Sequence, residues 1–213
     1  MTLTREKIVV ASALAFAMPP SFVLVSSLGG KHPVPPPSWL TTPLDSAIAV
    51  VPLAVWAYIS WYPSSLAVLL AGRENFRRLC VAEFIAFLLC STIHILWPVT
   101  IERPALDALT GASARALRAI YAIDKPVSLF PSFHAAVAPI LVQLRPSSPL
   151  LRVFIWAWMG SICLSCVLTK QHYVLDVVAG LAVGGMSVVL AERVLQKTAE
   201  TQEAPSAMPS ASG

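Results

Sequence analysis

The sequence predicts an all-α integral membrane protein, built as a bundle of six helices with its polar loops gathered on the outer face. Two observations lead to this prediction. Hydrophobic residues make up 56% of the 213 residues and charged residues only 12%, whereas soluble domains carry about 25% charged residues. The apolar residues also form runs of roughly 20, the length that crosses a bilayer as a helix.

The six expected spans cover residues 8–28, 46–71, 79–97, 132–144, 150–168 and 173–194. The first run is long and no small-residue cleavage site follows it, so we interpret it as a retained span rather than a signal peptide. A proline-rich loop leads to the second run, which Pro52 and Pro63 are expected to bend. The third run follows a short basic loop.

The last three spans follow the longest polar region, residues 98–131, in which 113–123 are expected to form a short surface helix. Ser132 is well placed as the N-cap of the fourth span. The tail is rich in alanine, serine, proline and glutamate and is expected to be disordered. The chain then divides into a first span with its proline-rich loop (1–44), a core (45–195) and the tail (196–213).

The basic residues predict the orientation of the bundle. Nine of the 15 Lys and Arg residues fall on the side of the two termini, in shorter loops, and six fall on the other side. Because basic loops stay in the cytoplasm, we expect cytoplasmic termini. The polar turns would then lie on the periplasmic, extracellular or lumenal side. All four cysteines lie in apolar runs, and we expect free thiols.

Three separate segments would bring six polar residues to that outer face: Arg103, Ser132, His134, Lys170, His172 and Asp176. Arginine binds phosphate through a planar fork, and a helix N-terminus offers free N–H groups to an anion. His172 and Asp176 are four residues apart, so on a helix the carboxylate would lie beside the imidazole and orient it. The plain structural alternative is that this pair caps and solvates a helix start.

Together these residues are suited to cleaving a phosphate ester without a metal or other cofactor. His172 would attack phosphorus, with Asp176 as its partner. His134 would protonate the departing oxygen. The substrate phosphate would be bound by Arg103, Ser132 and Lys170.

Three motifs resemble those of the type 2 phosphatidic acid phosphatase superfamily: P-S-F-H at 131–134, H-Y-V-L-D at 172–176 and, before both, R-P at 103–104. The resemblance covers residues 45–194. It implies a helical bundle and a phosphohistidine intermediate at His172, with Asp176 as its partner. It also implies His134 as the acid, and phosphate contacts from Arg103 and Ser132.

Three positions depart from the family pattern. Leu96 stands where a lysine is usual, Phe133 where a glycine is usual, and Cys166 where an arginine precedes the nucleophile by six residues. Lys170 and Lys125 are candidates to replace the missing basic ligands. The variant motifs are similar to the branch of inositolphosphotransferases and inositol phosphorylceramide synthases, which pass a phosphoryl-linked head group to an alcohol.

We therefore expect a lipid phosphate phosphatase, or a related head-group phosphotransferase, acting on a phospholipid or lipid phosphate in the bilayer. In a transferase, an alcohol such as a ceramide would replace water, and the motifs do not separate these activities. Nucleic acid is not an expected partner. Two alternatives stay open: a non-catalytic carrier of anionic lipids with the same pocket, and a metal site formed by His94, His134 and His172.

Overall fold

The structure is a computed structural model that describes residues 4–203. Within this range all named elements are helical, which confirms the predicted all-α class. The helices are α1 (Arg5–Gly29), α2 (Pro43–Ala47), η1 (Pro52–Ala54), α3 (Val55–Ile59), η2 (Ser64–Leu70), α4 (Arg73–Leu96), α5 (Ala112–Ile123), α6 (Phe133–Leu141), α7 (Pro149–Leu168) and α8 (Val174–Glu203).

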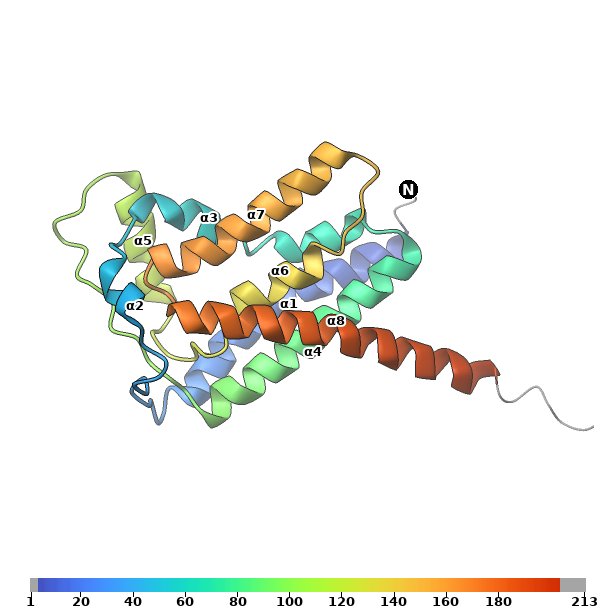
Figure 1. The fold of residues 1–213 in the computed structure, drawn as a ribbon, viewed down its shortest axis with the longest axis horizontal. Helices are drawn as coiled ribbons and strands as arrows, with labels where there is room; N and C mark the ends of the chain where they lie inside the picture. Colours follow the sequence, from blue (N-terminus) through green and yellow to red (C-terminus); the bar gives the residue numbers. More distant parts are fainter. Residues whose placement is uncertain (1–3, 204–213) are drawn as a thin grey trace, which may run out of the picture.

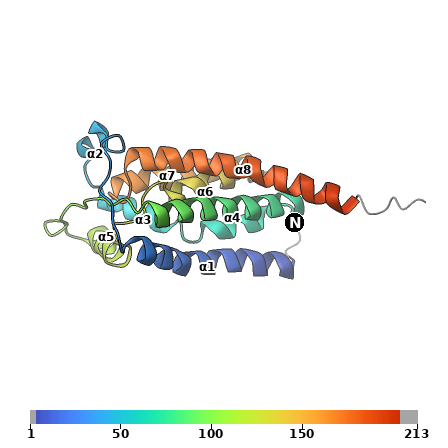
Figure 2. The ribbon, with the colours of Figure 1, turned by 90° about the horizontal axis from the view of Figure 1, so that it is seen from below.

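The bundle is centred on the short helix α6, which packs against α8, α7 and α4. Figure 1 shows α6 between α7 and α8, and Figure 2 shows α1 as an outer layer on the side of α4. The start of α1 and the end of α8 lie at one end of the bundle. The start of α8 lies at the opposite end, with α2 and α5.

Three helices among the described residues are long and apolar enough to cross a membrane: α4, α7 and, within α8, Val174–Thr201. A shorter apolar stretch covers Pro20–Gly29 of α1. Helix α6 has nine residues and is therefore about 14 Å long, against about 30 Å for the hydrocarbon core of a bilayer. The expected short helix over 113–123 is confirmed as α5.

The expected single span over 46–71 is replaced by four short pieces, α2, η1, α3 and η2. Proline explains two of the breaks. Pro52 begins η1, and Pro63 is the N-cap of η2. A proline inside a helix removes a hydrogen bond and clashes with the preceding turn, so these positions start new pieces rather than bend one helix. At the other end of the chain, α8 continues to Glu203, beyond the expected core boundary at 195.

Two glycines of α8 allow it to approach α6 very closely. A Cβ on Gly180 would overlap the carbonyl oxygen of Ser132, and one on Gly184 would overlap the carbonyl oxygen of Ala136. Gly185 faces open space instead. Small residues at such positions let helix backbones meet in membranes. The start of α6 is thereby held against the start of α8, the region that carries the candidate site.

Candidate active site

His172 lies in the turn between α7 and α8, and not within a helix as its spacing from Asp176 suggested. The Cys166 carbonyl at the end of α7 accepts from the backbone N–H groups of Gln171 (3.0 Å) and His172 (3.1 Å). Lys170 adopts a left-handed conformation with φ 54°, which is uncommon for a residue other than glycine. This reversal turns the chain back and presents the His172 side chain to the start of α6.

The imidazole of His172 is held through its Nδ1 atom. Nδ1 lies 3.1 Å from the Leu129 carbonyl oxygen and 3.5 Å from Oδ2 of Asp176. A carbonyl can only accept, so Nδ1 carries the proton and Nε2 keeps its lone pair. Asp176 is fully buried, and its Oδ2 also accepts from the Tyr173 backbone N–H at 2.9 Å. The closer acceptor of the ring proton is therefore a carbonyl that no motif indicated.

His134 approaches His172 from the first turn of α6, with ring centroids 5.5 Å apart. Its ring stacks on Tyr58 at 4.5 Å and lies 4.3 Å from Trp61. Its Nε2 atom is buried and has no hydrogen-bond partner among the described residues. The structure thus brings the two predicted histidines together and leaves one unpartnered nitrogen on His134.

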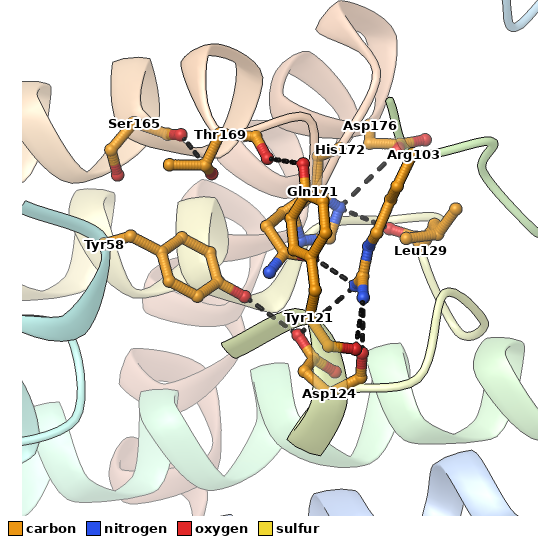
Figure 3. A network of polar contacts seen from close by, with 10 residues as sticks. All are labelled: Tyr58, Arg103, Tyr121, Asp124, Leu129, Ser165, Thr169, Gln171, His172 and Asp176. Atoms are coloured by element: carbon orange, nitrogen blue, oxygen red, sulfur yellow. Dashed lines mark hydrogen bonds and ion pairs between the residues drawn. The ribbon is translucent and has the colours of Figure 1, made fainter. Parts of the chain in front are cut away.

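Arg103 reaches the same region, but its guanidinium is engaged by the protein (Figure 3). It donates to the backbone carbonyls of Asp124 (2.5 Å) and Tyr121 (3.3 Å) and to Oε1 of Gln171. The Asp124 carboxylate lies 3.8 Å away and also accepts from the Tyr58 hydroxyl at 3.1 Å. Arg103 therefore ties α5 to the turn that carries His172.

Burial shifts the pKa of both charged groups in this network. It lowers the pKa of Arg103, and the neighbouring Asp124 opposes this effect. It raises the pKa of Asp124, while Arg103 and the Tyr58 hydrogen bond oppose the rise. Burial also raises the pKa of Tyr121 to about 12. Arginine is effectively always protonated in proteins, so Arg103 remains a fixed positive charge.

Ser132 and Lys170 are also tied to backbone groups. Ser132 is fully buried and its hydroxyl accepts from the Ala135 N–H at 3.4 Å, which confirms it as the N-cap of α6. The Lys170 ammonium donates to the Asp45 carbonyl at 2.5 Å. Asp45 in turn caps α8, because its Oδ1 accepts from the Val174 N–H at 2.8 Å. The predicted phosphate ligands thus have structural partners in this state.

Two cavities flank His172. A small one of about 30 Å³ is lined by polar groups that include His94, Lys125, Ser128, His134, Gln171 and His172. A larger one of about 300 Å³ lies on the other side and is lined in part by Asp45, Glu102, Arg103, Lys170, His172 and Tyr173. The predicted site residues are therefore divided, with His134 on one side and Arg103 and Lys170 on the other. His172 belongs to both.

A third, mainly apolar cavity of about 420 Å³ adjoins the small one. The two share Phe22, Ser26, Asp124, Lys125 and His134 in their linings. The apolar part comes from Pro20 and Val23 of α1, Trp61 and Tyr62 after α3, and Ile120 and Ile123 of α5. The chemistry at the two histidines thus lies beside a hydrophobic chamber, with Lys125 at the junction.

The alternative metal site of His94, His134 and His172 is not brought together among the described residues. His94 instead places its Nε2 atom 2.9 Å from the Pro131 carbonyl oxygen, linking α4 to the start of α6. Among the described residues, a different trio has ligand atoms within 4.8 Å of one another: His134, Cys166 and His172. All four cysteines are free, as the sequence predicted.

Several residues of the site were not predicted. Gln171 precedes His172 directly in the polar turn of residues 169–172, so its position could have signalled a role. Asp124, Tyr58 and Asp45 carry no such signal, because they reach the site from segments distant in sequence.

Comparison with known proteins supplies one match. A family model described as the PAP2 superfamily matches residues 34–190, more than half of the chain. No curated protein and no solved structure matches the chain. The matched range contains Arg103, His134, Cys166 and His172, and it ends within α8.

Proposed function

The chain belongs to the PAP2 superfamily, and from this membership we propose that it is a membrane phosphatase or phosphotransferase that cleaves a phosphate ester of a lipid at His172. Superfamily membership supports phosphatase or phosphotransferase activity on a phosphorylated substrate and a membrane setting. The observation that carries the proposal is the placement of His172. Its Nδ1 is held by Leu129, and His134 faces it at a ring separation of 5.5 Å.

In the first step, Nε2 of His172 attacks phosphorus. The N–P bond forms as the bond to the leaving oxygen breaks, and the protonated His134 gives its proton to that oxygen. The imidazole becomes positively charged, and the buried Asp176 carboxylate 3.5 Å from Nδ1 stabilises that charge. Asp176 is thus a positioning residue that acts through His172.

In the second step, His134 takes a proton from water or from an alcohol, which attacks phosphorus and breaks the N–P bond. With a phosphomonoester substrate, water gives free phosphate and an alcohol gives a new phosphomonoester. With a phosphodiester substrate, water gives the head-group phosphate and an alcohol gives a new phosphodiester. Both outcomes restore neutral His172 and protonated His134. The transferase branch named above and the phosphatases therefore share the first step and differ only in the acceptor.

The apolar cavity of about 420 Å³ supports a lipid substrate. Its volume lies within the range of about 300–1,000 Å³ that is usual for small-molecule sites. A hydrocarbon tail in this chamber would place the attached phosphate beside Lys125 and His134, which line both this cavity and the small one. Lys125 is therefore a candidate phosphate ligand alongside Arg103, Ser132 and Lys170.

We also propose that this end of the bundle faces the outer side of the membrane. The start of α1 and the end of α8 lie at the end of the bundle opposite the start of α8, which His172 closely precedes in the chain. The excess of basic residues on the side of the termini then supports cytoplasmic termini. In this arrangement α6 and the short pieces between residues 43 and 70 complete the bundle beside α1, α4, α7 and α8.

The decisive experiment follows a labelled phosphoryl group. Purified protein in detergent receives labelled phosphatidic acid or phosphatidylinositol, with and without a ceramide or diacylglycerol acceptor. His172→Ala is the test variant. His32→Ala is the matched control, because His32 is exposed in the loop after α1.

Three results separate the hypotheses. Label released as phosphate by the wild type and by His32→Ala, but not by His172→Ala, indicates a phosphatase. Label that enters a new lipid only when acceptor is present indicates a transferase. If the label does not move in any protein while lipid binding is retained, the proposed catalysis is wrong and the carrier alternative remains.

A further inference from the structure

Three soft metal ligands meet where α6, α7 and the turn before α8 come together. They are one ring nitrogen each from His134 and His172 and the sulfur of Cys166, and all three atoms lie within 4.8 Å of one another. We propose that these side chains form a Zn²⁺ site, and that bound Zn²⁺ inhibits the reaction by occupying both histidines. The inhibition rests on the proposed function, whereas the metal site does not.

The ligand atoms are available. Nε2 of His134 is buried without a hydrogen-bond partner among the described residues. His172 is committed through Nδ1 to the Leu129 carbonyl, which leaves Nε2 for a ligand. Metal-binding histidines usually donate their other ring N–H to a carbonyl or carboxylate in this way. Cys166 is fully buried and is not in a disulfide.

The three ligand atoms have to move only a short distance toward one another to bind zinc. Tetrahedral zinc has Zn–N bonds of about 2.0–2.1 Å and Zn–S bonds of about 2.3 Å, so its ligand atoms lie about 3.3–3.7 Å apart. From separations of up to 4.8 Å, each atom has to move toward the ion by less than about 1 Å. The adjoining cavity of about 30 Å³ is lined by both histidines and has room for one water as the fourth ligand.

The donor set favours zinc over the common hard cations. Imidazole nitrogen and thiolate sulfur suit Zn²⁺, whereas Mg²⁺ and Ca²⁺ require oxygen ligands. On binding, the Cys166 thiol releases its proton to solvent and its sulfur forms the bond to zinc. The thiolate cancels part of the ion's charge, and Asp176, 3.5 Å from the His172 ring nitrogen, lies close enough to stabilise the remainder.

Cys166 is also one of the three positions at which this chain departs from the pattern that its motifs resemble, in which an arginine precedes the nucleophile by six residues. A guanidinium carries a permanent positive charge and cannot join a cation site. The cysteine converts a cationic position into a metal ligand, and it does so beside the two histidines on which the proposed chemistry depends.

The site is tested by metal binding to the untagged protein in detergent, with Zn²⁺ and Co²⁺ as the probes. Cys166→Ser is the test variant, and Cys163→Ser, one turn earlier on α7, is the matched control. Wild type and Cys163→Ser should bind one Zn²⁺, and their Co²⁺ forms should show a thiolate-to-cobalt absorption band. Cys166→Ser should lose that band and bind Zn²⁺ more than about tenfold more weakly, because even changes to outer-shell partners cost about 10–100-fold.

A second variant, His134→Gln, should weaken Zn²⁺ binding similarly, and helical circular dichroism verifies that each variant is folded. Equal Zn²⁺ affinity in wild type and Cys166→Ser, or a cobalt band that survives in Cys166→Ser, would overturn the site.

Phosphate release then tests inhibition. If the wild type binds Zn²⁺ but neither releases phosphate nor passes the label to a lipid acceptor under any condition, the proposed function fails and the metal site stands. If it releases phosphate that Zn²⁺ at saturating occupancy leaves unchanged, the inhibition is wrong.

Discussion

The backbone N–H of Ser132 donates a 3.0 Å hydrogen bond to the carbonyl oxygen of Asp176. This bond joins the N-cap residue of α6 to the first turn of α8. It fixes the start of α6, which carries His134, against the start of α8, next to His172. The relative position of the two histidines is thus set by main-chain atoms, and helix packing should control it.

Gly184→Ala should weaken the packing of α6 on α8. A Cβ at Gly184 would overlap the backbone of Ala136, which cannot rotate away. Inserting a methyl group into a packed interface costs about 1–3 kcal/mol, so Tm in detergent should fall. Gly185→Ala is the matched control, since a Cβ there meets nothing within 4 Å. Equal Tm values for the two variants would contradict the packing described here.

Asp45→Ala should destabilise the start of α8. The carboxylate caps the Val174 N–H at 2.8 Å, and losing an aspartate cap costs about 0.5–2 kcal/mol. The Lys170 contact goes to the Asp45 carbonyl and is available in the variant as well. Thermal unfolding should show a lower Tm than in Asp107→Ala, which changes an exposed aspartate in the loop before α5. A matching Tm in both variants would show that the cap contributes nothing.

Asp124 should make stability depend on pH. Burial raises its pKa above the ordinary value, so the folded chain holds this proton more tightly than the unfolded chain does. The stabilisation of the folded chain by protonated Asp124 is therefore present at low pH, and it is lost as the pH rises through the pKa of Asp124 in the folded state.

The Tm of the wild type minus the Tm of Asp124→Asn should accordingly decrease as the pH is raised from about 4, which is the ordinary pKa of an aspartate. A pH series of thermal unfolding measures the difference, with Asp107→Asn as the control. A difference that rises with pH would mean that Arg103 outweighs burial at this carboxylate.

Lys125→Met should impair the proposed reaction. Lys125 lies at the junction of the small polar cavity and the apolar one, where the phosphate of a lipid would sit. A hydrogen bond to a charged group is worth about 1.5–3 kcal/mol, so kcat/KM for phosphate release should fall about 10- to 100-fold. Lys31→Met, at an exposed lysine after α1, should leave it unchanged. If both variants match the wild type, Lys125 does not contact the phosphate.

The sequence predicted the helical class, the apolar segments and the motifs because each depends on local properties. An apolar run that is long enough to span a bilayer and holds no proline in its middle forms a continuous helix, as α4 and α7 illustrate. Ser132 could be identified as an N-cap because capping involves neighbours three residues away. The sequence was less informative over 46–71, where whether a proline bends or ends a helix depends on what packs around it.

What the sequence determined by itself was a membrane-embedded helical chain of the PAP2 superfamily and the residue types available for phosphoryl chemistry. Only the tertiary structure decided which atoms meet. It set the Leu129 carbonyl against His172, engaged Arg103 with Asp124 and Gln171, and placed Cys166 beside both histidines. These contacts depend on how the helices and the turns between them pack together, so no local pattern encodes them.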